Sequence, residues 1–522
     1  MRLIIASVDR NTFRGEGAEN TCVPGTFLLS GMGGIYLNAK KIGLGSAVAI
    51  CVGLIVATTC LVSLGNGMGS AGRWFILPML LVMVLNSFVG LSYSELNGLM
   101  PKVNGGTSQY LMVGVGPFFS LIGNTAAYVI TMILSACAEL SLCGLVLQTL
   151  FFPNLDPRII SIVILVLFFI VNYFGVDVFA KVQDIVVILL IGSMLVLGII
   201  GCVKGGIGVP ISNYHNPSWA EVGGFRGLMK YAAIAFWLFI GVEFVIPVAN
   251  DMKNPKRDIL LSIMLGLLLL FVVQSVLGWG MTNYLSLTDL STSSLPHLDY
   301  AKALLGNFGR YWMGIITMCA SISTLNTVFA SSSRIMCGMG EDRLFPKVFA
   351  KTNKHGVSVA GLLLLGVSIG VLILCNVGFS NSISLLILAA SCFWLLTYCL
   401  IHISVLALRV RYPDAPRRKK LNLAGIPQIL AIISNIYMIV NISTGEERFI
   451  IYKIFGILMA VLVVYALIWF LGVQKINPFR PVPMSLINDG ATLDELDAYV
   501  EKEKREKAER KMQKVAAKKV PE

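Results

Sequence analysis

A carboxylate next to a helix-weakening glycine stands out in the apolar stretch FWLFIGVEF, residues 236–244. Gly241 weakens a helix by about 1 kcal/mol relative to Ala, and Pro247 removes a backbone donor soon afterwards. Glu243 adds an ionisable group that costs ~3 kcal/mol near the middle of a bilayer. Three costly residues this close together predict an interrupted helix with a functional role. The alternative is a close helix contact at Gly241 and a carboxylate that bonds to a neighbouring helix.

Two other places could bind a polar ligand. Ala57-Thr58-Thr59 lies in the middle of the apolar stretch GLIVATTCLVSLGNGMG. Threonine hydroxyls in membrane helices commonly bond to the preceding turn, so packing is an equal alternative to substrate contact there. Glu139, in SACAELSLCG, needs a partner or a proton, because a carboxylate in an apolar environment is costly. It could carry a coupled proton, or form a structural hydrogen bond.

Hydroxyl groups in a later apolar block could coordinate a sodium ion. Serine and threonine are also common packing residues in membrane helices, so sodium coordination is the weaker of the two interpretations. The residues are Ser321, Ser323, Thr324 and Thr327. No paired histidines or metal-ligand spacing occur, and we predict neither a metal nor a cofactor.

The composition sets the environment of these residues. Of the 522 residues, 56% are hydrophobic and 13% are charged, and the apolar residues come in long blocks. A helix that crosses a ~30 Å hydrocarbon core needs about 20 mostly apolar residues. We therefore predict an all-α polytopic membrane protein with about 12 transmembrane helices, at residues 44–66, 75–100, 117–151, 158–175, 177–203, 228–251, 260–284, 310–338, 358–376, 383–408, 426–442 and 449–473.

The basic residues indicate a membrane topology rather than nucleic-acid binding. The net charge of +13 comes from Lys and Arg between the apolar blocks and in the tail. Because the loops after even-numbered spans carry the excess, both termini are predicted to be cytoplasmic. We divide the chain into an N-terminal cytoplasmic segment (1–42), a transmembrane domain (43–473) and a basic, helical cytoplasmic tail (474–522). A typical short cytoplasmic lead follows Met32, so we hypothesise that the natural chain starts there, without residues 1–31.

Three motifs resemble the amino acid-polyamine-organocation permeases. They are YSELNGLMPKVNGG (93–106), FIGVEFVIPVANDMKNPKRDI (239–259) and SSRIMCGMGEDRLFPKVFAK (332–351), in the order and spacing of that family. The resemblance covers roughly residues 43–473. It implies a five-plus-five inverted repeat in which the spans at 44–66 and 228–251 are discontinuous and enclose a central amino-acid site.

The resemblance also implies roles for the residues of the sixth span. Trp237 would be an aromatic gate, and Phe239 belongs to the same substrate-contacting segment. The backbone of Ile240 and Gly241 would receive the amino group of the substrate. Glu243 stands where the family has a residue implicated in gating or proton sensing.

The first span departs from the family pattern. Ala57-Thr58-Thr59 falls where the family usually has a Gly-Ser-Gly type sequence whose amides hold the substrate carboxylate. An unwound backbone is harder for a β-branched residue, although threonine hydroxyls could replace amide donors. Tyr128 is expected to face the central cavity. Residues 182–203 contain no lysine, so a lysine that substitutes for sodium in this span is not expected.

These observations predict secondary active transport of amino acids across the plasma membrane, by proton-coupled symport or amino acid exchange. No G-x-x-x-x-G-K-[ST] loop is present, so the energy would come from a coupled proton or a counter-substrate. Sodium-coupled transport of amino acids, amines or polyamines remains an alternative. A non-transporting membrane nutrient sensor is an alternative of another class, whereas no constellation suggests an enzyme. The expected partners are a small-molecule amino acid and the lipid bilayer, and the oligomeric state stays open.

Overall fold

The computed structural model describes residues 43–53, 55–101, 107–175, 180–212, 214–377, 379, 382–415, 417 and 423–488. The predicted N-terminal segment (1–42) and most of the predicted tail lie outside these residues. Within them, the secondary structure is helical, as predicted.

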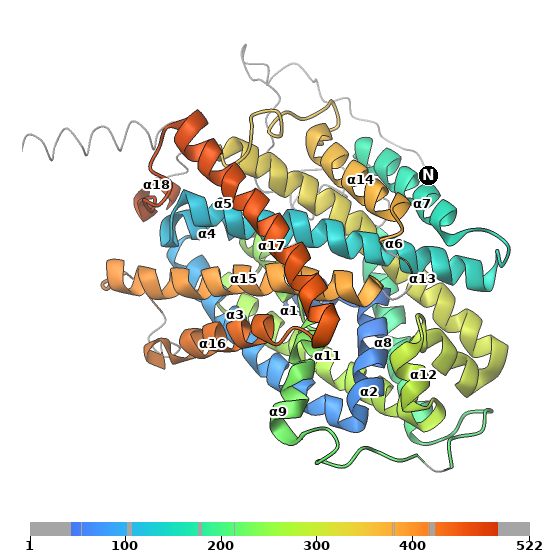
Figure 1. Ribbon diagram of the computed structural model, residues 1–522. Helices are drawn as coiled ribbons and strands as arrows, with labels where there is room; N and C mark the ends of the chain where they lie inside the picture. The colour runs from blue at the N-terminus through green and yellow to red at the C-terminus, as the bar shows by residue number, and fades with distance from the viewer. Residues whose placement is uncertain are drawn as a thin grey trace, which may run out of the picture.

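The helices follow the predicted spans in order (Figure 1). The first half contains α1 (Leu44–Gly53), α2 (Thr58–Ala71), α3 (Ile76–Leu99), α4 (Thr107–Gly114), α5 (Pro117–Thr125), α6 (Thr131–Leu150), α7 (Pro157–Tyr173) and α8 (Ala180–Cys202). The second half contains α9 (Gly224–Leu228), α10 (Ala232–Trp237), α11 (Pro255–Tyr284), α12 (Leu287–Thr292), α13 (Pro296–Glu341), α14 (Val359–Leu374), α15 (Ser382–Arg411), α16 (Ile426–Val440), α17 (Gly445–Leu467) and α18 (Met484–Asn488). Short 3₁₀ or π segments join several of them: η1 (Gly72–Phe75), η2 (Ala126–Ile130), η3 (Met229–Tyr231), η4 (Val242–Asp251), η6 (Leu423–Gly425) and η7 (Ile468–Gln474).

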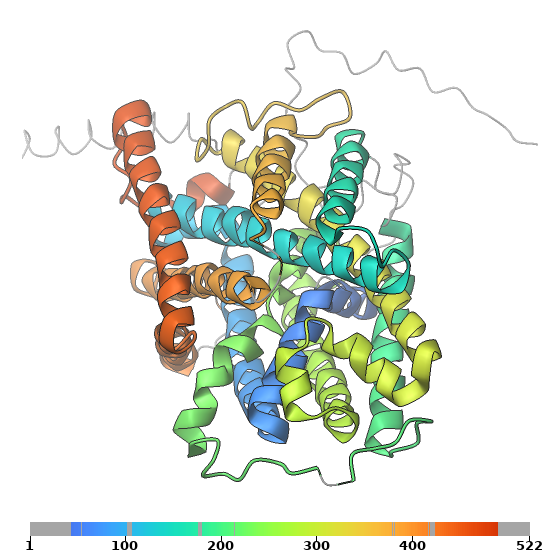
Figure 2. The same ribbon diagram turned by 45° about the vertical axis from the view of Figure 1, so that its right-hand side comes forward.

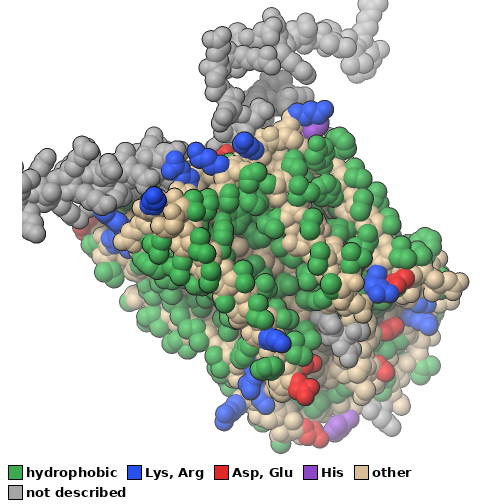
Figure 3. Space-filling model, turned by 45° about the horizontal axis from the view of Figure 1, so that its top comes forward, with side chains coloured by type: hydrophobic (Ala, Val, Ile, Leu, Met, Phe, Trp, Pro, Cys, Tyr) green, Lys and Arg blue, Asp and Glu red, His purple; other side chains and the backbone are tan. Residues whose placement is uncertain are grey.

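The helices suit a bilayer. Among the described residues, nine helical stretches are long and apolar enough to cross a membrane, and α1, α7 and α14 are shorter apolar helices. Leu, Ile, Val and Phe side chains are exposed on outward faces of α7, α8, α11, α14, α16 and α17. Figure 3 shows a broad hydrophobic band, with the charged side chains gathered toward its two ends. The chain is therefore a multi-pass integral membrane protein.

Two helices run alongside the interrupted spans and position them. The long helix α11 packs against α1, α2, α3, α8 and η4, while α15 packs against α3, α4, α6, α10, α16 and α17. Most residues of α2 and α10 are buried, whereas α16 and α17 lie at the periphery in Figures 1 and 2. The core is therefore built around the segments where α1 gives way to α2 and α10 gives way to η4.

Candidate functional site

The first span is broken between α1 and α2, at the position of the Ala57-Thr58-Thr59 stretch. The helix stops at Gly53 and restarts at Thr58, and Ala57 has an extended backbone with φ −120° and ψ 172°. Thr58 and Thr59 are the first residues of α2. They lie inside the new helix and not in the unwound segment, so their branched side chains do not oppose the break.

The sixth span is broken as the glycine predicts. Helix α10 ends at Trp237, and Gly241 has φ +101°, a left-handed conformation that an L side chain rarely adopts. The chain then continues as the 3₁₀ segment η4 from Val242. The break thus extends from Leu238 to Gly241.

A cavity lies between the two breaks, and α6, α13 and α15 also contribute residues to its wall. It contains about 550 Å³ of space not filled by protein atoms, part of it open to solvent. Its wall is mostly apolar. The lining residues are Ile55, Ala57, Thr59, Cys60, Thr131, Met132, Ser135, Ala136, Glu139, Trp237, Ile240, Gly241, Phe244, Thr324, Leu325, Val328 and Trp394.

The side chain of Glu139, which belongs to α6, binds the amino-terminal end of α2. Its Oε1 accepts a 2.9 Å hydrogen bond from the Thr58 amide and its Oε2 a 3.0 Å bond from the Thr59 amide. Ser321 of α13 donates its hydroxyl to Oε1, and the Thr58 hydroxyl in turn bonds to Ser321. The first turn of a helix has unpaired amides and a partial positive charge that favour an anion. A side chain of the protein itself therefore fills the place that the family resemblance assigned to the substrate carboxylate.

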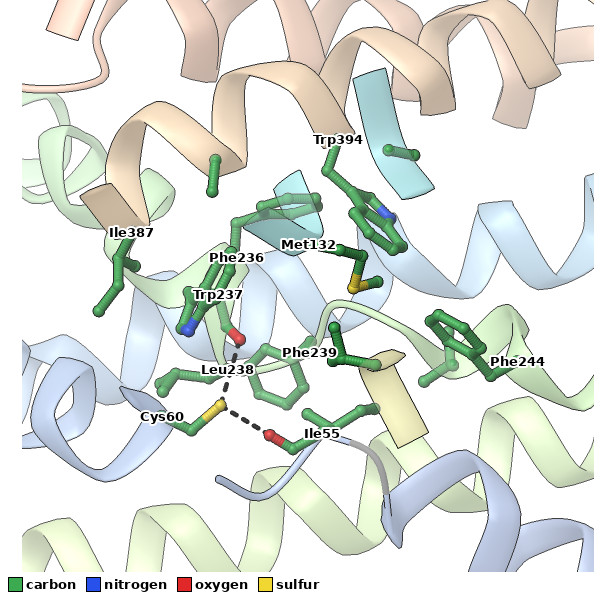
Figure 4. Close-up of a cluster of buried hydrophobic side chains, with 14 of the residues drawn as sticks. Ile55, Cys60, Met132, Phe236, Trp237, Leu238, Phe239, Phe244, Ile387 and Trp394 are labelled. Carbon is green, nitrogen blue, oxygen red and sulfur yellow. Dashed lines mark hydrogen bonds between the residues drawn. The ribbon is translucent and has the colours of Figure 1, made fainter. Parts of the chain in front are cut away.

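Side chains also satisfy the backbone that the second break exposes. Gln274 of α11 donates to the Leu238 carbonyl at 3.0 Å, and Asn86 of α3 donates to the Phe239 carbonyl at 3.1 Å. The thiol of Cys60 lies between the carbonyls of Ile55 and Trp237 and joins the two breaks (Figure 4). Among the carbonyls in this break, the one at Ile240 remains for a ligand, because the Gly241 carbonyl accepts from the Phe244 amide.

Glu243 lies behind the cavity wall and bonds to α15. It is 2% exposed. Trp394 donates its indole N–H to Oε1 at 2.9 Å, and Tyr398 donates its hydroxyl to Oε2 at 2.7 Å. The spacing of four residues places both donors on the same face of α15. A proton on this carboxyl would alter both contacts between the broken span and α15.

Tyr128 is one layer away from the cavity. Its ring packs at 5.5 Å from that of Trp394 and at 5.9 Å from that of Phe244, and both of these residues line the cavity. The Thr107 hydroxyl links the hydroxyl of Tyr128 to that of Tyr93 on α3. Tyr128 thus supports the wall of the cavity from behind.

The hydroxyls considered as sodium ligands differ in whether they already have a hydrogen-bond partner. Thr327 donates to the Ser323 carbonyl, as expected for a threonine that bonds to its own helix. The hydroxyls of Ser323 and Thr324 are buried without a hydrogen-bond partner, and Thr324 lines the cavity.

The structure brings about half of the predicted site residues to the cavity surface. Those at the surface are Ala57, Thr59, Glu139, Trp237, Ile240, Gly241 and Thr324. The others lie behind it: Thr58, Tyr128, Phe239, Glu243, Ser321, Ser323 and Thr327. Ser321, considered only as a sodium ligand, bonds to Glu139 and Thr58 instead. Sequence reasoning missed Asn86, Gln274, Trp394 and Tyr398. Asn86 and Gln274 carried a usable signal, since each is an amide side chain inside an apolar span.

Charged groups join the ends of several helices. Glu95 at the end of α3 pairs with Arg409 of α15 at 2.6 Å and with Arg417 at 3.2 Å. Asp342, just after α13, accepts hydrogen bonds from Ser108 and Gln109 of α4.

Comparison with known proteins identifies the chain. Residues 42–484 match the family described as amino acid permease. The chain belongs to this family. The permease is 26% identical over 331 residues to the histidine permease HisP of Lactococcus lactis subsp. cremoris (strain MG1363). The aligned region covers 60% of this chain and 68% of HisP. It is 23% identical over 458 residues to the branched-chain amino acid permease BcaP of Bacillus subtilis (strain 168). This aligned region covers 80% of this chain and 92% of BcaP.

A solved structure shares the fold of the permease. The crystal structure of the Eremococcus coleocola manganese transporter in complex with an aromatic bis-isothiourea substituted compound aligns with a TM-score of 0.53 and 12% identity, over 82% of this chain and 94% of that chain. At this identity the likeness shows the fold alone. Two discontinuous spans, the first and the sixth, fit the five-plus-five inverted repeat that the motifs predicted.

Proposed function

We propose that this permease carries out secondary active transport of amino acids across the plasma membrane, by proton-coupled symport or amino acid exchange. The observation that carries the proposal is the meeting of two broken spans at one cavity, within a chain of the amino acid permease family. Broken helices present free backbone groups to a charged substrate near the middle of the membrane. HisP and BcaP are named for histidine and branched-chain amino acids, which makes these the first substrates to test.

The proposed roles follow from position. The Ile240 carbonyl and the backbone at Gly241 receive the ammonium group, and Trp237 closes the cavity on one side. The apolar lining from Ile55, Met132 and Phe244 suits a neutral side chain. Glu139 and Glu243 are the two acids available for proton coupling. The orientation with both termini in the cytoplasm, and the division into a 43–473 transmembrane domain with flanking cytoplasmic segments, belong to this proposal.

Uptake of labelled amino acids into proteoliposomes tests the proposal. Uptake driven by an inward proton gradient, with empty vesicles, indicates symport, whereas uptake that needs unlabelled amino acid inside indicates exchange. If no amino acid or amine moves under either condition, the transport proposal fails. Binding without flux would favour the nutrient sensor instead.

A sodium-coupled mechanism is the second candidate, because the Ser323 and Thr324 hydroxyls are buried without a partner. Replacing external sodium by choline at constant pH should abolish uptake if sodium is coupled. Thr324→Val, which keeps the shape and removes the hydroxyl, should then raise the sodium concentration needed for half-maximal uptake. Uptake that is the same in sodium and choline excludes this mechanism.

A further inference from the structure

Glu139 and an amino-acid carboxylate would compete for the same two amides. In the structure, the Thr58 and Thr59 amides at the start of α2 donate to the two carboxylate oxygens of Glu139. Glu139, Ala57 and Thr59 all line the cavity between the breaks. A substrate carboxylate that reaches these amides must therefore displace the side chain of Glu139.

A second observation indicates that a ligand contacts this cavity. The indole N–H of Trp237 is buried without a hydrogen-bond partner, and Trp237 lines the cavity from the other break. Trp237 is 4% exposed. Buried donors in proteins are nearly always paired, so an unpaired one at a cavity wall calls for an acceptor that arrives from outside.

Displacement would leave Glu139 without its partners. It would lose two amide donors and the hydroxyl donated by Ser321. Glu139 is 3% exposed, and none of the ion pairs of the described residues includes it. A carboxylate that is buried, unpaired and ionised is far more costly than a protonated one.

We propose that the substrate carboxylate replaces Glu139 at the amides of Thr58 and Thr59, and that the displaced Glu139 takes one proton from the aqueous phase. The negative charge at the start of α2 is then conserved: one carboxylate leaves as a neutral acid and another arrives. This exchange of carboxylates makes substrate binding and proton uptake a single event. The inference rests on the proposed function, since it assumes that the ligand is an amino acid.

Other titratable groups near Glu139 are few. Cys60 on α2 and Cys143 on α6 interact with it electrostatically. Glu243 is the other buried acid in this region, but it is held separately by Trp394 and Tyr398. The elements that pack against α6 therefore bring hydroxyls and thiols to Glu139, and Glu243 is the competing proton acceptor that an experiment must separate from it.

Calorimetric titration of purified wild-type permease tests the proposal. The ligand is L-isoleucine, or the neutral amino acid with the strongest uptake in the transport assay. Titrations in two buffers with different ionisation enthalpies, from pH 5.5 to 7.5, give the number of protons taken up. We expect about one proton per bound amino acid where Glu139 is ionised, and an affinity that weakens about tenfold per pH unit. Isoleucinol, which has the same side chain and ammonium group but no carboxylate, should bind without proton uptake.

Two variants test whether Glu139 is the group that takes up the proton. Glu139→Gln should bind L-isoleucine without proton uptake, with the same affinity at every pH and more tightly than wild type at pH 7.5. Ser321→Ala removes one donor that holds Glu139 in place, so it should retain the proton uptake and bind several-fold more tightly at pH 7.5. The alanine variant keeps the test valid if Glu139→Gln does not fold.

The outcomes separate the inference from the proposed function. If wild type binds or transports amino acids with no proton uptake, the carboxylate exchange is wrong and the transport function stands. The exchange is also wrong if isoleucinol takes up the same proton, or if the uptake disappears in Glu243→Gln and remains in Glu139→Gln. If wild type neither binds nor transports any amino acid, the proposed function itself fails.

Discussion

Tyr398 donates a 2.7 Å hydrogen bond to Glu243, and this bond connects α15 to the segment that follows the break in the sixth span. Trp394, one turn earlier on α15, donates to the other oxygen of the same carboxylate. Both donors satisfy an ionised carboxylate, and a protonated one would have to present its own hydrogen to one of them. The pair is therefore a place where protonation can change how the broken span meets α15.

Glu243→Gln should weaken coupling to protons. The amide accepts hydrogen bonds at one atom only, so one of the two donors on α15 loses its acceptor. We expect uptake driven by a pH gradient to fall about tenfold or more, which corresponds to about 1.4 kcal/mol. Uptake at several external pH values measures the effect. Tyr398→Phe, which keeps the carboxylate, is the control and should retain a pH-dependent uptake. An unchanged pH profile in Glu243→Gln would show that the role assigned to this carboxylate is wrong.

Gly241→Ala should destabilise the permease through its backbone. A Cβ at this position would make ordinary contacts, the nearest at 3.6 Å to Phe244, so space is not the limit. The strain comes from φ +101°, and residues held in such regions cost about 1 to 3 kcal/mol. Thermal unfolding in detergent should show a lower Tm. The matched control is Gly338→Ala in α13, where a Cβ meets nothing within 4 Å and the helix should gain about 1 kcal/mol. Equal Tm changes in the two variants would contradict the backbone explanation.

Asn86→Ala and Gln274→Ala should each destabilise the break in the sixth span. Each variant leaves a buried carbonyl, of Phe239 or of Leu238, without its donor. An unsatisfied buried group costs about 1 to 3 kcal/mol. Ser87→Ala is the control, because its hydroxyl bonds to the Val84 carbonyl in its own helix, and it should stay within about 0.5 kcal/mol of wild type. If the three variants unfold at the same temperature, these amides do not support the break.

The burial of Asp342, just after α13, predicts a pH-dependent contribution to stability. Burial raises the pKa of Asp342 to about 6, against the hydrogen bonds from Gln109 and Ser108 that lower it. Because the pKa is higher in the folded protein than its usual value of 3.8, folding favours the protonated form. Stability should therefore fall as pH rises from about 4 to about 6, by about 3 kcal/mol at most, and stay level above that range.

Asp342→Asn isolates this contribution, since it removes the titration. The Tm of wild type should decrease relative to that of Asp342→Asn as pH rises through this window. Asp156→Asn is a control of opposite sign, because its hydrogen bonds with Arg158 lower the pKa of Asp156. A constant difference between wild type and Asp342→Asn from pH 4 to 7 would rule out the titration.

The sequence predicted the spans and the second break for physical reasons that are local. Length and apolarity determine a membrane helix, and Gly241 with Pro247 and Glu243 makes an uninterrupted helix costly. The first break was less certain, because Thr58 and Thr59 resist an unwound backbone. The structure shows that the unwound residues precede them and that both threonines begin a new helix.

The partners of the two acids could not be predicted from local sequence. Glu139 bonds to amides 81 and 80 positions away, and Glu243 bonds to side chains 151 and 155 positions away. Such pairs depend on how the spans pack against one another. The bonds of Asn86 and Gln274 to the second break have the same origin, even though an amide inside an apolar span was a visible signal.

The side-chain amides of Asn86 and Gln274 also determine which parts of the permease can move independently. Asn86 belongs to α3 and Gln274 to α11, and both hold carbonyls of the break in the sixth span. A displacement of the break relative to either helix would unpair a carbonyl of a buried residue, Leu238 or Phe239. During alternating access, the broken span should therefore travel with α3 and α11 as one rigid body, and the sliding surface should lie where this body meets α6, α13 and α15.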